Sequence, residues 1–154
     1  MGHLAEIRSA VAARPPVTVA AVDRARIVLA VVLIALAPEG RIAPEGLARV
    51  VQVCRGAPVL AALDAAGIEE LAGLTLRALV ARGPDRVLAD LRGLMPRGLA
   101  ETALALAVRA AFAKGRVAPD TAGILGGLCT HLGLPAVWLS DLFEVIGALE
   151  RPFD

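Results

Sequence analysis

The sequence predicts an all-α fold, a helical bundle of about 7–9 helices, and three observations lead to this prediction. First, 57% of the 154 residues are apolar but only 3% are aromatic, so the core must consist of Ala, Leu, Val and Ile. Ala and Leu are strong helix formers. Second, no stretch alternates apolar and polar residues between turn signals, as a half-buried strand would. Third, part of the sequence is duplicated.

The duplicated pattern is an apolar segment, a turn, and a segment that begins with Pro. It occurs in residues 27–45 and again in residues 105–120. The turn reads GRIAPE from Gly40 in the first copy and GRVAPD from Gly115 in the second, 75 positions later. A repeat of this length indicates two copies of one supersecondary unit, so we predict two pseudo-symmetric helical halves.

A length of 154 residues is typical of a single domain. We expect residues 1–16 to form an N-terminal helix and a Pro linker, because Arg14 is followed by two prolines, which end a helix. Residues 17–154 are then one helical domain, with the two repeats at about residues 26–63 and 101–138.

Apolar residues at helical spacing predict nine helices, and Pro or Gly delimits most of them. They are expected at residues 3–13, 19–37, 44–54, 58–66, 68–81, 84–95, 99–113, 119–132 and 135–149. Thr18 is the expected N-cap of the second helix. Gly67 is expected to close the helix at 58–66, and Gly133, in a left-handed conformation, the helix at 119–132.

Two of these helices are almost free of charge, which indicates burial on every side. Residues 27–37 contain no charged side chain, and Arg109 interrupts the apolar part of the helix at 99–113. We expect these two helices to form a packed central pair. Arg109 should then either extend its long side chain to the surface or pair with a carboxylate such as Glu101 or Glu144.

The charge balance and the length of the apolar segments exclude two classes of partner. Sixteen basic and 15 acidic residues give a net charge of +1, which provides no electrostatic attraction to nucleic acid. The uncharged run at residues 27–38 is shorter than the roughly 20 residues that a helix needs to cross a bilayer. We therefore expect neither a nucleic-acid partner nor a membrane span.

Residues 37–45 follow the order apolar helix, acid-Gly-x-aliphatic-x-Pro-acid, second helix, and residues 113–120 follow the same order with Lys114 in place of the first acid. Residues 94–103, LMPRGLAETA, lead into the second copy with a pattern similar to Leu-Pro-x-x-Leu-x-Glu-Thr-Ala. Together these motifs resemble the TerB family of tellurite-resistance proteins, over about residues 22–149. The resemblance implies a TerB-type helical bundle in the cytoplasm, without known enzymatic activity. It also implies a role in tellurite resistance or stress response, exerted by binding.

The resemblance further implies an ion site, because family members usually carry Asp just before the Gly and acids five and six positions after it. Oxygen ligands of this kind suit Ca²⁺ and other divalent cations. Here Glu39 and Glu45 remain, and we predict a divalent-cation site on them. The alternative is that these carboxylates face water at a helix start, where the helix dipole favours them. The residues that depart from the family pattern are Arg41, Gly46, Lys114, Arg116 and Thr121, with Asp120 kept.

Other reactive side chains are few. Cys54 and Cys129 occupy equivalent positions and are expected to be buried, reduced thiols, with ligation of tellurium or zinc as the alternative. Cys129 and His131 stand two positions apart, so they do not share a helix face as a metal pair would. The pair Gly126-Gly127 lacks the Lys and Ser/Thr of a phosphate loop. No nucleophile and base are arranged for catalysis, so we expect no enzyme.

The sequence therefore predicts a small, non-enzymatic, cytoplasmic TerB-like protein that acts by binding, with a protein partner or a second copy of itself. An alternative is a helical interaction module or homo-oligomer with no tellurite or metal role, since an apolar excess can serve as a partner surface.

Overall fold

The computed structural model describes residues 19–112 and 115–151, and over these residues the fold is all-α, as predicted. The elements are α2 (Val19–Leu36), α3 (Pro44–Arg55), the 3-10 turn η1 (Pro58–Leu60), α4 (Ala65–Arg82), α5 (Pro84–Arg92), α6 (Arg97–Ala111), α7 (Pro119–His131) and α8 (Ala136–Leu149). None of the described helices is long and apolar enough to cross a membrane. The helix expected at residues 3–13 and the Thr18 cap lie outside the described residues.

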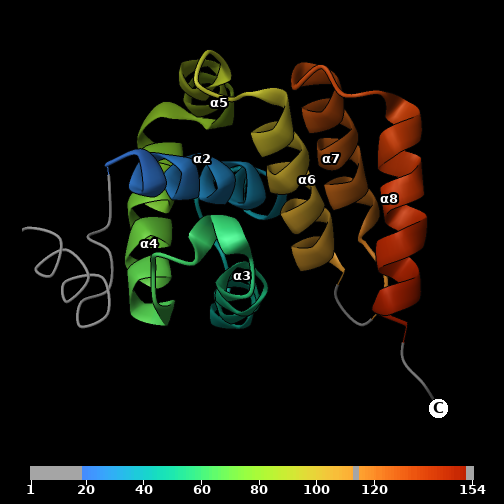
Figure 1. Cartoon of the computed structure of the whole chain (residues 1–154), viewed down its shortest axis with the longest axis horizontal. Helices are drawn as coiled ribbons and strands as arrows, with labels where there is room; N and C mark the ends of the chain where they lie inside the picture. The colour runs from blue at the N-terminus through green and yellow to red at the C-terminus, as the bar shows by residue number, and fades with distance from the viewer. Residues whose placement is uncertain (1–18, 113–114, 152–154) are drawn as a thin grey trace, which may run out of the picture.

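Helix α2 lies at the centre of the described fold (Figure 1). Every side chain from Ile27 to Ala35 is buried. A charge within this segment would lie unpaired in an apolar interior, which explains why the sequence has none there. The helix contacts α3, α4, α5, α6, α7 and η1, and its most extensive contact is with α6. The expected central pair is therefore confirmed.

The remaining helices cover this pair from several sides. In Figure 1, α4 crosses the left-hand part of α2, while α7 and α8 stand beside α6 toward the right. Helix α8 forms the edge of the described bundle and packs against α6 and α7. The side chain of Ile146 is buried at this contact, whereas Val145 and Leu149 are exposed.

The segment between α3 and α4 differs from the prediction. Only Pro58–Leu60 is helical, as a short 3-10 turn, and α4 begins at Ala65. Asp64 is the N-cap of α4, and its side chain accepts a hydrogen bond of 2.7 Å from the N–H of Gly67. Gly67 therefore lies in the first turn of α4 and does not close a helix. An Asp at the N-cap satisfies an otherwise unpaired N–H group, and this effect outweighs the weak helix propensity of the Gly.

Helix boundaries recur at the offset of the duplicated sequence. Helices α2 and α6 end at Leu36 and Ala111, which are 75 positions apart. The helices that follow the two turns, α3 and α7, both begin with Pro, at equivalent positions. In each turn the Gly has a positive φ, 84° at Gly40 and 81° at Gly115. Residues other than Gly are strained at such angles, so the repeated Gly follows from the shape of the turn.

The end of α7 also follows its sequence signal. Gly133 has a φ of 73°, as predicted for a left-handed cap. The N–H of Leu134 donates to the carbonyl of Cys129 at 3.0 Å, and the N–H of Gly133 donates to that of Thr130 at 3.1 Å. These two bonds satisfy carbonyl groups that the helix leaves without a partner.

The turn at Gly40 fits closely against α4, and this predicts a stability difference. A Cβ atom on Gly40 would lie 2.8 Å from the carbonyl oxygen of Leu76 and 2.9 Å from the backbone nitrogen of Val80. A Cβ atom on Gly133 would meet nothing within 4 Å. Gly133→Ala should thus lower the free energy of unfolding by about 1–2 kcal/mol through backbone strain alone. Gly40→Ala should cost about 1–3 kcal/mol more, because the overlap is with backbone atoms. Urea unfolding followed by circular dichroism measures both losses, and equal losses would contradict the close contact.

Candidate functional site

The two turns of the duplicated sequence meet at one cavity of about 940 Å³. The first turn contributes Arg41, Ile42 and Ala43, and the second contributes the equivalent Arg116, Val117 and Ala118. Helix α2 packs against α6, and residues of the turns that follow the two helices line the same cavity. The two copies of the turn sequence thus contribute equivalent residues to one cavity.

The lining of this cavity is positively charged. It contains three arginines, Arg41, Arg49 and Arg116, and one acid, Glu45, which gives a formal charge of +2. The first turns of α3 and α7 also line it. The N–H groups of a first helical turn have no partner within the helix, and they add positive potential to that of the side chains.

Only one of the two predicted cation ligands is among the residues that line the cavity. Glu45 lines the cavity, whereas Glu39 is exposed and is not among the lining residues. Over residues 19–112 and 115–151, no three His, Cys, Asp or Glu side chains form a group that could hold a metal ion. Divalent cations require several oxygen ligands, and the arginines of the cavity repel them. Lys114 lies outside the described residues.

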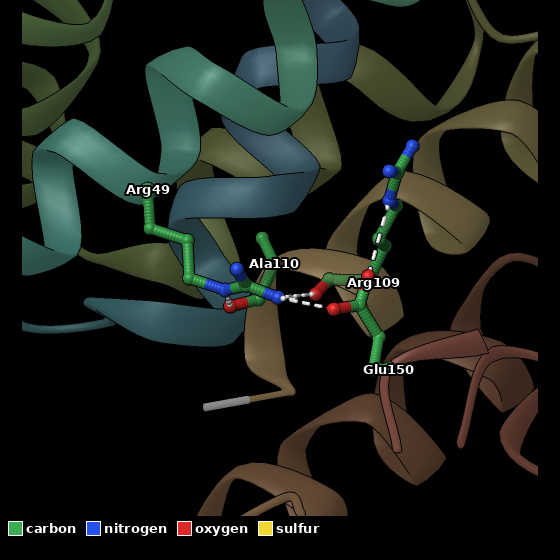
Figure 2. Close-up of polar contacts among 4 residues, drawn as sticks. All are labelled: Arg49, Arg109, Ala110 and Glu150. Atoms are coloured by element: carbon green, nitrogen blue, oxygen red, sulfur yellow. Dashed lines mark hydrogen bonds and ion pairs between the residues drawn. The ribbon is translucent and has the colours of Figure 1, made fainter. Parts of the chain in front are cut away.

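Arg49 fixes one wall of the cavity by joining α3 to the end of α6. Its Nε donates to the carbonyl of Ala110 at 3.2 Å, and its Nη2 donates to the carbonyl of Arg109 at 2.9 Å (Figure 2). Both carbonyls belong to the last turn of α6, where a helix leaves four such groups without an internal partner. The planar guanidinium supplies the Ala110 carbonyl with a donor and gives a second donor to the Arg109 carbonyl, which also accepts from the N–H of Phe112 at 3.3 Å. Its charge suits the negative end of the helix.

Arg109 extends its side chain to the surface, as one of the two alternatives predicted, and it pairs with neither Glu101 nor Glu144. Its Nε lies 3.4 Å from Oε1 of Glu150, and Oε2 of the same carboxylate lies 3.5 Å from Nη2 of Arg49 (Figure 2). Glu150, at the end of α8, thus bridges two arginines, while Glu101 pairs one turn back within α6. Glu150 is 41 and 101 positions from these arginines, and no local pattern in the sequence indicates pairs at such separations.

Both cysteines are buried and free, as predicted. Burial raises the pKa of the Cys54 thiol to about 12. It also raises the pKa of Cys129, whose Sγ donates to the carbonyl of Leu134 at 3.3 Å. The thiolate is the form that binds metals and reacts with electrophiles. Both side chains are therefore inert thiols at neutral pH.

Comparison of the chain with known protein families, with characterised proteins and with solved structures gives no significant match. The resemblance to the TerB family therefore rests on the two turns and on residues 94–103.

The double hydrogen bond of Arg49 predicts a specific loss of stability. Arg49→Lys keeps the charge but removes the planar fork, so one carbonyl of α6 loses its donor. We expect the free energy of unfolding to fall by about 1–2 kcal/mol. Glu150→Gln removes only the longer ion pairs and should cost less than about 1 kcal/mol. Urea titration of both variants measures the two losses of stability. A larger loss in Glu150→Gln would contradict the prediction, because the carboxylate and not the guanidinium fork would then stabilise the contact between α3 and α6.

Proposed function

We propose that this chain is a non-enzymatic TerB-like protein that binds a ligand in the cavity between its two turns. The setting of this activity is the cytoplasmic response to tellurite or a related stress. The observation that carries the proposal is the convergence of equivalent residues from both turns on one cavity. Arg41 and Arg116, which occupy equivalent positions in the two copies of the sequence, are among them.

Three further features support the proposal. The coincidence of helix ends and of positive-φ glycines at an offset of 75 positions is consistent with two TerB-type halves. The free thiols of Cys54 and Cys129 fit a reducing compartment. The polar side chains of the cavity are arginines with Glu45 and Thr121, a set suited to holding a charged group.

The experiment that tests this proposal fills the cavity and measures resistance in cells. Ala43 lines the cavity and is exposed, so Ala43→Trp adds bulk there without entering the core. Ala89→Trp, on the exposed face of α5, is the matched control. In a tellurite-sensitive bacterium that expresses the chain, we expect the parent and Ala89→Trp to permit growth at higher tellurite concentrations, and Ala43→Trp to lose this effect.

Two outcomes of the cell experiment would count against the proposal. Full protection by Ala43→Trp would exclude the cavity as the functional site. Absence of protection by the parent chain would refute the tellurite role. Circular dichroism of the purified variants shows whether either Trp disturbs the fold.

A second candidate function is self-association through the outer face of α8. Val137, Val145 and Leu149 are exposed there, and their spacings of eight and four residues place them on one stripe of the helix. Helix α8 lies at the edge of the described bundle (Figure 1). An exposed apolar stripe on an edge helix is typical of a protein interface.

Self-association through α8 predicts a change of mass on substitution. The parent chain should sediment as a dimer at micromolar concentration, and Val145→Glu should sediment as a monomer because a buried, unpaired charge would disrupt the interface. Leu94→Glu, at another exposed apolar position, is the control and should leave the dimer intact. A monomeric parent at all concentrations in sedimentation velocity would exclude this function.

A further inference from the structure

We infer that the cavity between the two turns binds a phosphate monoester with an apolar body, and that Arg41 and Arg116 hold its dianionic head. The inference rests on the proposed function, which places the ligand in this cavity. It assigns an anion to the site, whereas the family resemblance implies a divalent cation.

The guanidinium groups of Arg41 and Arg116 are available to a ligand. Within residues 19–112 and 115–151, neither donates a hydrogen bond nor forms an ion pair, although both line the cavity. Arg49, which lines the same cavity, is engaged by two carbonyl groups and by Glu150. The site therefore combines one arginine that is fixed by the protein with two whose side chains have no partner among residues 19–112 and 115–151.

The two arginines Arg41 and Arg116 favour a dianionic phosphate over a monocarboxylate. A guanidinium presents a planar fork of N–H donors that matches two phosphate oxygens. Two such groups supply two positive charges, which balance the charge of −1.5 to −2 that a phosphate monoester carries at pH 7. A monocarboxylate of the same size would leave one of the two arginines without a counter-charge.

Glu45 is the one group of the lining that opposes an anion. Its carboxylate, in the first turn of α3, repels a phosphate and partly neutralises the arginines. Glu45 therefore lowers the affinity of the cavity for an anion and raises its affinity for a cation. Glu45→Gln should strengthen the binding of an anion, whereas the same change would weaken the binding of a cation.

The size and composition of the cavity indicate a ligand larger than inorganic phosphate. About 940 Å³ is at the upper end of the range for small-molecule sites. Apolar side chains contribute much of the remaining lining, among them Leu36, Ile42, Ala111 and Val117. An apolar body attached to the phosphate would bury its surface against them, which adds affinity that the ion alone lacks.

The experiment is calorimetric titration of the full chain with phenyl phosphate, inorganic phosphate and benzoate at pH 7.5 and low salt. We expect phenyl phosphate to bind more tightly than either of the others. Arg41→Ala and Arg116→Ala should each weaken it by about tenfold or more, because each removes charge-assisted hydrogen bonds. Arg77→Ala, an exposed arginine on α4 that does not line this cavity, should leave the affinity unchanged. Glu45→Gln should tighten binding several-fold.

Several results would overturn the inference. They are absence of heat with phenyl phosphate, equal affinity for benzoate, an equal loss in Arg77→Ala, or weaker binding by Glu45→Gln. Failure here is distinguishable from failure of the proposed function. If Ala43→Trp abolishes protection in cells but phenyl phosphate does not bind, the cavity is the site and the ligand class is wrong. If phenyl phosphate binds through both arginines but Ala43→Trp still protects, the ligand class stands and the cellular role is wrong.

Discussion

The packing of α2 against α6 is the constraint on which the rest of the structure depends. Over residues 27–35, α2 is buried on every side, so neighbouring helices must enclose it completely. Its largest contact is with α6, whose buried face contains several alanines, and small side chains let two helices approach closely. The two helices end at equivalent points, and this places both turns at a common edge. The cavity is a consequence of that arrangement.

The turns then determine where the outer helices begin. A Gly with positive φ reverses the chain after each central helix, and a Pro at the first helical position starts the next one. At Gly40 the turn also lies against the backbone of α4, so the position of the first turn is coupled to a helix outside the duplicated unit.

Much of the fold could be predicted because its signals are local. Apolar runs identified the central pair, prolines located the starts of α3, α5 and α7, and Gly133 located the end of α7. The prediction was wrong at Gly67, which was expected to end a helix. Asp64 caps the start of α4 instead, and this places Gly67 in the first turn of that helix. The convergence of the two turns was not predicted, since it depends on how α2 and α6 pack.

The residues that shape the site were harder to predict. Arg41 and Arg116 first stood out as departures from a family pattern, although their equivalence in the two copies was visible in the sequence. The contacts of Arg49 with the end of α6 and with Glu150 join residues at least 60 positions apart. An amphipathic helix with an exposed arginine has the same sequence pattern whether or not that arginine caps another helix.

The site is also less symmetric than the sequence repeat. The position equivalent to Arg49 in the second copy is Ile124, which is half-buried and apolar. The first outer helix, α3, is thus tied by hydrogen bonds to the end of the opposite central helix, α6, whereas an apolar side chain occupies the equivalent place in α7. The two halves therefore each contribute a turn and an arginine to the lining of the cavity, but only the first half contributes an arginine that is bonded to a central helix. A ligand that bridges Arg41 and Arg116 would add a polar connection between the two turns, so ligand binding and the relative position of α3 and α7 should be thermodynamically coupled.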